Sequence, residues 1–354
     1  NYTDHIVVIT YLASGNEKRQ KLMQQLIPTT EITIKTKATA PGIVVGLSAC
    51  LAGHAVRYNG GHSQSRLCLN TLSDHFQFET FCPEVAAGFG TPRPVMRLIG
   101  DPQNPVLTYS DNQQQNLTEK LVSAFNKPLE TMGRLDGYIL MKNSPSCGLE
   151  RIKIYQANGS LHVQRGRGLF AAALKQKYPL MPIEEEGRLH DRRLYENFIL
   201  RVYAHHRFRC EVAADPTVHK LIAFHSSYKY VLMAHDQGYY RSLGAMLAAP
   251  KSVPLEQLLE DYFQMFMTAL AKPATAKNHC NVLQHLLGYL KQDVSSSARQ
   301  SIDEVIHRYR QGEVPLVVPL TLIRHYIEQE GNEYIRMQCY LQPYPDKLGL
   351  ANRI

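Results

Sequence analysis

The stretch Ile43-Val44-Val45-Gly46-Leu47-Ser48-Ala49-Cys50 decides the fold of the first half of the chain. Its run of Val, Ile and Leu predicts a short buried strand, and a cysteine follows where that strand should end. Two later runs also lead into a cysteine: Phe76–Cys82, and Gly137–Lys142 before Cys147. Ligands collect beyond the carboxyl ends of strands in open α/β sheets, so the three runs predict one sheet with three cysteines at one edge.

Further strand and helix signals alternate with these runs. Leu117–Leu129 has the apolar spacing of a helix. Arg151–Tyr155 and Leu161–Val163 flank the turn dipeptide Asn158-Gly159, which predicts a hairpin. We therefore expect an α/β domain over residues 44–210.

The second half of the chain changes character after Asp215, where Pro216 is a good helix start. Apolar residues recur there at helical spacing in six segments: Val218–Ala234, Leu255–Leu270, Val282–Leu290, Ile302–Tyr309, Leu320–Ile327 and Tyr334–Tyr340. Gly, Pro or Ser separate them, and Pro315–Thr321 is predicted as a buried connection. Strand signals are few, so residues 216–354 are predicted to form an all-α C-terminal domain with short connections.

Residues 1–43 form an N-terminal extension to which we assign no function. Ile6–Leu12 is strand-like, Glu17–Leu26 has helical spacing and Thr29–Lys37 alternates like a half-exposed strand, which gives a β-α-β pattern. The opening apolar run is short and does not follow a basic segment. We therefore expect no signal peptide.

Composition narrows the compartment and the class of partner. No run of 18 or more apolar residues occurs, which argues against a membrane span. Seven cysteines without close pairs favour free thiols in a reducing cytoplasm over a disulfide scaffold. The net charge of +8 fits a polyanionic partner such as RNA, but it is spread thinly and is weak evidence alone.

One basic block is more specific. The segment from Arg188 to Arg209 contains six arginines and three histidines but only two acidic residues, Asp191 and Glu196, and aromatic residues are interleaved. This pattern fits an amphipathic helix with a solvated face and, equally, a helix that contacts phosphates. The candidate RNA-binding residues are Arg188, Arg192, Arg193, Arg201, Arg207 and Arg209.

The three loop cysteines are the candidate metal ligands. Singly, Cys50, Cys82 and Cys147 could each be a small buried apolar residue. Zinc sites usually show a close pair of ligands, and no such pair is present, while His54 and His62 lack a third local ligand. Three soft thiolates from separate loops suit a [4Fe–4S] cluster with one iron free of protein ligands. The other cysteines lack this loop context: Cys68, Cys210, Cys280 and Cys339.

Polar residues beside these cysteines are candidates for proton transfer. Glu84 lies two residues after Cys82, and Ser144 and Ser146 lie shortly before Cys147. A carboxylate there can act as a base toward water, and a hydroxyl can relay a proton. The alternative is local: Glu84 would stabilise the first turn of a helix, and the serines would satisfy a turn.

Several motifs, taken in order along the first half, are similar to one family, the thiouracil desulfidases. They are Val45–Gly53 (VGLSACLAG), Val56–His62 (VRYNGGH), Cys82–Gly88 (CPEVAAG), Gly90–Pro94 (GTPRP), Asn143–Gly148 (NSPSCG), Pro182–Leu189 (PIEEEGRL) and Glu196–Phe198 (ENF). The helical half resembles an uncharacterised bacterial domain often fused to that family. Its matching segments are Lys220–Ser226, Lys229–His235, Lys272–Thr275 and Asn281–Tyr289. The fused form resembles two-domain tRNA 4-thiouridine desulfidases, and only about the first 43 residues depart from the pattern.

The resemblance implies an α/β cluster-binding domain plus an all-α C-terminal domain that is tRNA-binding. Cys50, Cys82 and Cys147 would hold a [4Fe–4S] cluster whose fourth iron binds the thiocarbonyl sulfur, and Glu84 and Ser144 would handle protons. Candidate substrate-binding residues are Ser48, Asn59, His62, Arg93 and Ser146. The expected reaction is a non-redox, hydrolytic conversion of 4-thiouridine in cytoplasmic tRNA to uridine, with release of sulfide.

Two alternatives remain open at this point. The chain could be a desulfidase of free thiouracil, with the helical half serving another purpose. It could also be a cluster-bearing sensor or binding protein without catalysis, in which case the fourth iron would need a fixed ligand.

Overall fold

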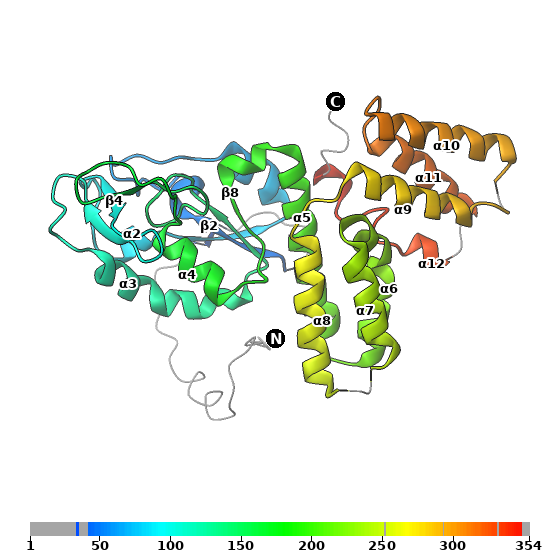
Figure 1. The fold of residues 1–354 in the computed structure, drawn as a ribbon, viewed down its shortest axis with the longest axis horizontal. Coiled ribbons are helices and arrows are strands. Elements are labelled where there is room, and N and C mark those ends of the chain that lie inside the picture. The colour runs from blue at the N-terminus through cyan, green and yellow to red at the C-terminus, as the bar shows by residue number, and fades with distance from the viewer. Residues whose placement is uncertain (1–32, 35–41, 251–252, 293, 331–332, 349–354) are drawn as a thin grey trace, which may run out of the picture. The chain divides into compact units, whose positions relative to one another are not determined.

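The computed structural model describes residues 33–34, 42–250, 253–292, 294–330 and 333–348. The chain divides between His190 and Asp191 into an α/β unit and a helical unit, whose elements are labelled in Figure 1. The helix at Arg192–Arg207, which the sequence analysis placed within residues 44–210, belongs to the helical unit.

The α/β unit is built on a five-stranded sheet in the order β1-β3-β2-β6-β8. Its strands are β1 (Thr33–Ile34), β2 (Val44–Ser48), β3 (Gln77–Phe81), β6 (Gly137–Leu140) and β8 (Ile183–Glu185). β1 is antiparallel to β3, and the other neighbours are parallel. The predicted α/β sheet is therefore confirmed, and the carboxyl ends of β2, β3 and β6 lie side by side at one edge.

The core of this unit lies between the sheet and its helices. The helices are α2 (Pro83–Ala86), α3 (Thr118–Thr131) and α4 (Leu169–Lys177). The Phe170 ring of α4 is in ring contact with Phe81, Phe125 and Tyr138. Tyr138 pairs in register with Gly46 on β2, where a β-carbon would lie 2.2 Å from the tyrosine ring. Gly46 therefore leaves the space that the Tyr138 ring fills.

A small second sheet completes the α/β unit. It has the order β5-β4-β7, with β4 (Met96–Ile99), β5 (Val106–Tyr109) and β7 (Ile154–Tyr155). The predicted hairpin is confirmed by two antiparallel bridges, Tyr155 with Leu161 and Ile152 with Gly166. Gly159 has a φ of 82° in its turn, a conformation that favours glycine.

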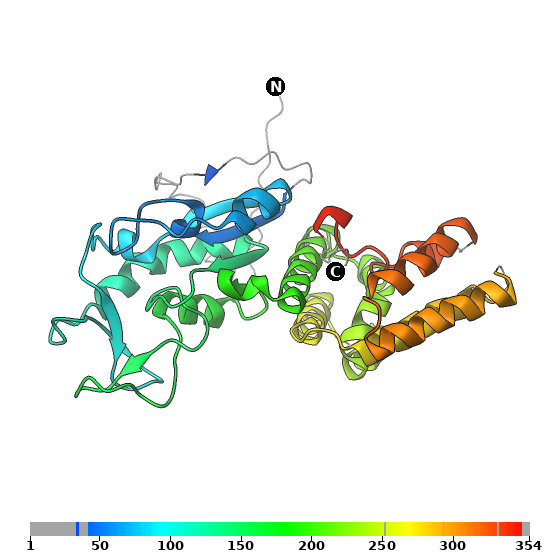
Figure 2. The ribbon, with the colours of Figure 1, turned by 90° about the horizontal axis from the view of Figure 1, so that it is seen from above.

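The described part of the second unit is helical, as predicted. Its helices are α5 (Arg192–Arg207), α6 (Val218–His235), α7 (Gln237–Ala248), α8 (Leu255–Leu270), α9 (Ala276–Tyr289), α10 (Ser296–Gln311), α11 (Val317–Glu330) and α12 (Glu333–Arg336). α6, α7 and α8 pack against one another, and α9, α10 and α11 form a second group. Figure 2 shows α10 and α11, in orange, side by side.

Two differences from the predicted helices have local causes. Asp236 caps α7 by accepting a hydrogen bond from the Tyr239 backbone N–H, and α7 was not predicted. The prediction of a connection over Pro315–Thr321 is wrong, because α11 begins at Val317. Pro319 fits there since N–H groups in the first helical turn have no partner within the helix.

Most of the N-terminal extension lies outside the described residues, including the predicted elements Ile6–Leu12 and Glu17–Leu26. Within Thr29–Lys37 the structure describes Thr33–Ile34 as β1. Across the described ranges, no helix has both the length and the apolar character needed to cross a membrane.

Candidate functional site

The three predicted ligand cysteines follow three neighbouring strands. Cys50 lies in a short helical turn directly after β2, and Cys82 lies between β3 and α2. Cys147 lies in the loop after β6. Cys50 and Cys147 are buried and Cys82 is partly buried. Because β2 pairs in parallel with both β3 and β6, the structure brings the three loops to one edge of the sheet.

The three thiols also act on one another electrostatically. Burial, followed by the charge of Cys82, raises the pKa of Cys50 to about 12. Burial raises the pKa of Cys147 well above its usual value, with Cys82, Glu84 and Cys50 adding to the effect. The pKa of Cys82 is also raised by burial, although backbone N–H groups of Val85 and Glu84 that bond its sulfur oppose the effect. Three thiolates at this edge therefore require a positively charged group to neutralise them.

Ser144 organises the loop that carries Cys147. Its hydroxyl oxygen accepts hydrogen bonds from the backbone N–H groups of Ser146 (3.2 Å) and Cys147 (3.0 Å). The same hydroxyl donates to Glu84 Oε1 at 3.4 Å. Gly148 lets the loop pack closely, since a β-carbon there would lie 2.0 Å from Ile152 Cδ1. The two predicted proton-transfer residues are therefore in contact, although they are 60 positions apart in the chain.

Glu84 is held from its other side by Arg93. The Arg93 guanidinium forms an ion pair with Glu84 Oε2, and Arg93 itself is 8% exposed. Its Nη1 donates to the carbonyls of Val56 (3.0 Å) and Gly90 (2.8 Å). The guanidinium of Arg93, which was a candidate for substrate binding, is thus already bonded to Glu84 and to two backbone segments.

The other substrate-binding candidates divide into buried and exposed groups. Ser48 is buried, and its hydroxyl accepts from the Met141 backbone N–H at 3.0 Å and bonds the Cys147 thiol. Ser146 is fully buried beside Cys147. Asn59 and His62 are exposed and accept hydrogen bonds from backbone N–H groups two residues further along the chain.

Tyr138 is a site residue that the sequence reasoning missed. Its hydroxyl is buried and has no hydrogen-bond partner among the described residues. Burial raises its pKa well above the usual value, and the charges of Cys147, Cys82 and Cys50 raise it further. The available signal was Gly46, because a glycine within a buried strand often marks a close approach by a neighbour.

The candidate RNA-binding arginines are placed unequally. Most of them have partners: Arg188 with Glu184, Arg192 with Glu196, Arg207 with Glu211, while Arg201 and Arg209 also make contacts. Arg207 also contacts the Cys339 sulfur and the face of Tyr228. Arg193 is exposed, and in the described part of the chain no ion pair is found for it. The structure therefore leaves Arg193 as the arginine of this set most available to a partner.

The donor set fits an iron–sulfur cluster better than one metal ion. Within the described ranges no three His, Cys, Asp or Glu side chains are grouped closely enough to hold a single ion. A cluster binds each thiolate through a separate iron, so its ligands stand further apart. Ser146 Oγ and Tyr138 OH are buried near the thiols without a partner in the described structure, and a bound group would meet such atoms.

Two family models match the chain, one in each half. The model described as 2-thiouracil desulfurase matches residues 45–186. The model described as a protein of unknown function, DUF1722, matches residues 229–345. The first match contains all three cysteines together with Glu84, Arg93 and Ser144.

Individual relatives include two bacterial proteins. The uncharacterized protein YbgA of Escherichia coli (strain K12) is 32% identical over 164 residues, which is 45% of this chain and 95% of the relative. The uncharacterized protein YbbK of Bacillus subtilis (strain 168) is 34% identical over 136 residues, which is 37% of this chain and 88% of the relative. A solved structure, the [4Fe-4S]-dependent thiouracil desulfidase TudS, is 26% identical, with a TM-score of 0.34, and the match covers 42% of this chain and 94% of that one. On these matches the chain belongs to the 2-thiouracil desulfurase family, and a DUF1722 domain is joined to it in the same polypeptide.

Proposed function

We propose that the protein is a [4Fe–4S]-dependent desulfidase that converts 4-thiouridine in tRNA to uridine by hydrolysis. Water supplies the new oxygen and sulfur leaves as hydrogen sulfide, so that C=S plus H₂O gives C=O plus H₂S without net electron transfer. The observation that carries the proposal is the meeting of Cys50, Cys82 and Cys147 beside Glu84, with Glu84 bonded to Ser144. A sensor would need the thiols but not this carboxylate–hydroxyl pair.

Cys50, Cys82 and Cys147 would hold the cluster through their thiolates. When bound, the cluster would supply a thiophilic iron that polarises the C=S bond as a Lewis acid and accepts the departing sulfur. Two of the ligand cysteines receive hydrogen bonds at sulfur. Ser48 bonds the Cys147 thiol, and the backbone N–H groups of Glu84 and Val85 bond the Cys82 thiol. Such donors stabilise the thiolate form that a cluster needs.

Glu84 would act as the base toward the attacking water. Its Oε2 is paired with Arg93, so Oε1 is the oxygen left to accept the proton, at the position where Ser144 Oγ also points. Ser144 would orient that oxygen by donating to it, and it would pass a proton toward the departing sulfur on releasing one of the two backbone N–H groups from which it accepts. Arg93 would fix the orientation of the carboxylate through their ion pair rather than bind substrate.

The helical unit, which begins at Asp191 and includes α5, would hold the tRNA. The exposed Arg193 is its best-placed phosphate contact, and a cytoplasmic location follows from the substrate. Free thiouracil is the second candidate substrate, because the matching family is named for 2-thiouracil.

The test uses anaerobically prepared full-length protein. We expect about four iron and four acid-labile sulfide atoms per chain, and stoichiometric release of sulfide from 4-thiouridine tRNA as uridine forms. Release from free 4-thiouracil with none from tRNA would move the assignment to the second candidate. Protein that binds a cluster but releases no sulfide from either substrate would contradict both.

A further inference from the structure

The loop between Gly53 and Ser65 forms a rim beside the Cys50 turn. It leaves that turn where the His54 N–H donates to the Ala49 carbonyl at 3.2 Å. It returns where the Ser63 N–H donates to the Cys50 carbonyl at 3.0 Å. Both ends of the loop are therefore bonded to the backbone that carries the first candidate ligand.

Arg93 fixes the same loop to the Glu84 side of the site. The Arg93 backbone N–H donates to the Tyr58 carbonyl at 2.8 Å, and its guanidinium bonds both Val56 O and Glu84. The tip is a tight turn in which the Gly60 N–H donates to the Arg57 carbonyl at 2.9 Å. The positions of Arg57 and Tyr58 are thus set by the group that holds the proposed base.

Arg57 carries a charge on this rim that the protein does not neutralise. Its guanidinium lies 5.9 Å from the centre of the Tyr58 ring, and no carboxylate pairs with it anywhere in the described ranges. The chain on either side of it is bonded to the Cys50 turn through His54 and Ser63, which places Arg57 on the rim beside that turn. Tyr58 is 42% exposed, so part of its side chain is accessible to a ligand.

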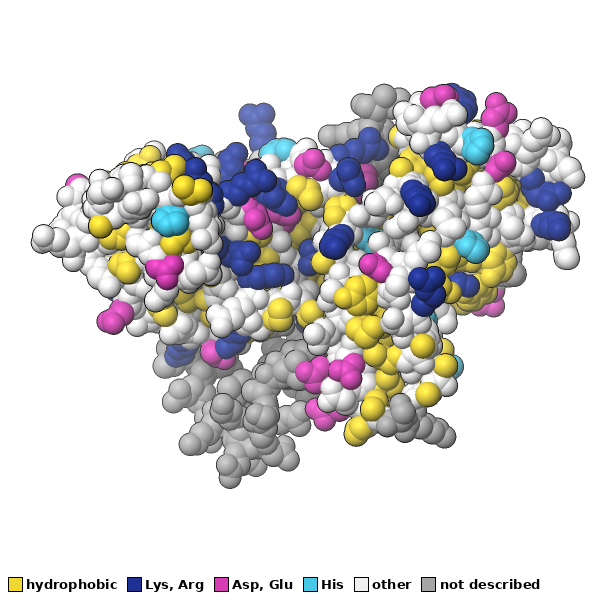
Figure 3. All heavy atoms as spheres, in the orientation of Figure 1, with side chains coloured by type: hydrophobic (Ala, Val, Ile, Leu, Met, Phe, Trp, Pro, Cys, Tyr) yellow, Lys and Arg dark blue, Asp and Glu magenta, His cyan; other side chains and the backbone are white. Residues whose placement is uncertain are grey.

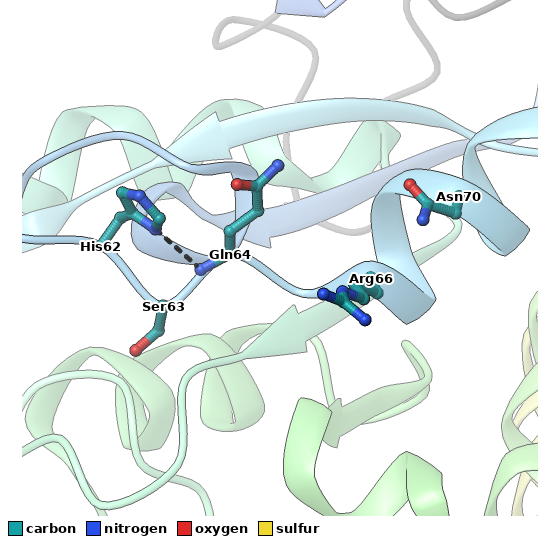
Figure 4. Close-up of a pocket in the computed structure, with 5 residues that line it drawn as sticks. All are labelled: His62, Ser63, Gln64, Arg66 and Asn70. Carbon is teal, nitrogen blue, oxygen red and sulfur yellow. Dashed lines mark hydrogen bonds between the residues drawn. The ribbon is translucent and has the colours of Figure 1, made fainter.

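Beyond the tip, the chain borders a polar hollow of about 500 Å³. It is lined by His62, Ser63, Gln64, Arg66 and Asn70, which include no acidic residue. Figure 4 shows the Ser63 hydroxyl and the Arg66 guanidinium on one side of this segment and the Gln64 amide on the other. In Figure 3, Lys and Arg side chains lie on the α/β unit around β8 with acidic side chains among them, and Arg188 pairs there with Glu184. Hydrogen-bond donors with an arginine and no carboxylate suit a phosphate group.

We propose that the loop from Arg57 to Arg66 binds the RNA backbone on either side of the thiolated nucleotide. Arg57 contacts the phosphate nearest the reacting base, Arg66 contacts a second phosphate in the hollow, and Tyr58 stacks on an adjoining base. This inference rests on the proposed RNA substrate and adds that the α/β unit itself distinguishes a polynucleotide from a free base.

The test compares Arg57→Gln and Arg66→Gln with the control Lys127→Gln. Lys127 is an exposed cation in the second half of α3, a helix that runs toward the start of β6 and so away from the cysteine edge. Each arginine variant is expected to lower the ratio of kcat/KM on 4-thiouridine RNA to kcat/KM on 4-thiouracil about tenfold. Each should also reduce the slope of log affinity against log salt for unmodified tRNA by about 1. The control should leave both quantities as in wild type.

The outcomes separate this proposal from the proposed function. Equal tRNA binding and equal salt slopes for wild type and both arginine variants would overturn the loop proposal while the desulfidase stands. An equal loss on both substrates, with tRNA binding unchanged, would overturn it too, because Arg57 would then act on the cysteine site. If wild type releases sulfide only from 4-thiouracil, the RNA substrate fails, and the tRNA-binding measurement still decides whether this loop holds phosphate.

Discussion

Cysteines in the two units of this protein show how context sets the role of a residue type. In the α/β unit Cys50, Cys82 and Cys147 follow adjacent parallel strands and act on one another. In the helical unit Cys280 and Cys339 are buried within helical packing, where the Cys280 sulfur lies 3.9 Å from the Ile306 carbonyl. The parallel sheet places the first three cysteines at the same edge, whereas Cys280 and Cys339 lie in separate surroundings within the helical unit.

Buried polar atoms without a partner occur in the described parts of both units, for example Thr108 Oγ1 and Gln338 Oε1, so what distinguishes two of them is their position beside the thiols. In the α/β unit the Ser146 and Tyr138 hydroxyls are buried near the thiols without partners among the described residues. In the helical unit His279 Nδ1 lies 2.8 Å from the Tyr340 hydroxyl, and Asn197 donates to the Leu270 carbonyl at 2.9 Å. An unsatisfied hydroxyl that also lies beside three thiols indicates a place for a ligand.

The largest expected effect comes from replacing the edge cysteines. Each of Cys50→Ala, Cys82→Ala and Cys147→Ala should abolish both the visible absorbance of the cluster and sulfide release, because each removes the ligand of one iron. Cys280→Ala, in the helical unit, should keep both. Iron analysis and absorbance of anaerobically prepared protein are the measurements. An active cluster in Cys147→Ala would refute the ligand assignment.

The next effect concerns the carboxylate beside the cysteines. Glu84→Gln keeps the shape of the side chain and removes the base, so kcat should fall by about 10²–10⁴ while iron content stays the same. Glu79→Gln is the matched control, since Glu79 is also a carboxylate of this sheet region paired with an arginine, Arg134. The rate of sulfide release gives kcat for both variants, and iron analysis gives their iron content. Turnover within a few-fold of wild type in Glu84→Gln would make Glu84 a structural residue.

Features that depend on local pattern were predictable from the sequence. The strands leading to Cys50 and Cys147 are apolar runs, and the strand leading to Cys82 alternates apolar and polar residues. All three end at turn residues, and parallel pairing then brings the ends together. The proximity of Glu84 and Ser144 follows from their small offsets from two of these cysteines. Most helices of the second half were predictable because an apolar stripe at helical spacing must pack on neighbours.

Features that depend on contacts between distant loops were not predictable. Arg93 was expected near substrate, but its role depends on where Val56 and Glu84 lie, and no spacing encodes that. Tyr138 looked like an ordinary strand residue, because its neighbour Gly46 lies on a different strand. α7 was missed since two glycines and two tyrosines weaken its helical pattern, although Asp236 supplies a cap.

A pair of glycine replacements should change stability in opposite directions. Gly46→Ala would place a β-carbon 2.2 Å from the Tyr138 ring, so the α/β unit should lose about 1–3 kcal/mol of unfolding free energy. Gly244→Ala on α7 meets no atom within 4 Å and should raise helix stability by about 0.5–1 kcal/mol. Both stability changes are measured by denaturant unfolding in which hydrogen exchange monitors each unit separately. A Gly46→Ala protein as stable as wild type would show that the Tyr138 ring moves freely.

Acid should weaken the helical unit through its buried histidines. Burial, then nearby His235 and Arg193, lowers the pKa of His279 to about 3, and burial, then Lys229, lowers the pKa of His225 to about 4. The unfolded chain binds these protons near pH 6.5 while the folded unit does not. Stability is therefore lost as the pH falls from about 6.5 toward 4, by up to about 1.4 kcal/mol per pH unit for each histidine.

Hydrogen exchange in α6 and α9 at pH 7 and pH 5 measures this loss in the full chain. His279→Gln should reduce the pH dependence of exchange in α9, because glutamine does not titrate. His285→Gln is the control, since His285 is exposed on the same helix. Equal exchange rates in α6 and α9 at the two pH values, after correction for intrinsic exchange, would contradict the expectation.

The smallest expected effect distinguishes two arginines at opposite ends of α5. Arg193 is exposed near its start, whereas Arg207 at its end is bound to Glu211, Cys339 and the Tyr228 ring. If α5 contacts phosphates, Arg193→Gln should weaken tRNA binding a few-fold and lower the salt slope by about 1, because one released counterion is lost. Arg207→Gln should instead lower the unfolding temperature and leave the salt slope unchanged, since its guanidinium is used within the unit. Filter binding of tRNA across a salt series, beside a thermal unfolding curve, separates the two. A salt slope that changes with Arg207 and not with Arg193 would show that the helical unit rearranges on RNA, and a slope that changes with neither would leave RNA recognition to the Arg57–Arg66 loop of the α/β unit.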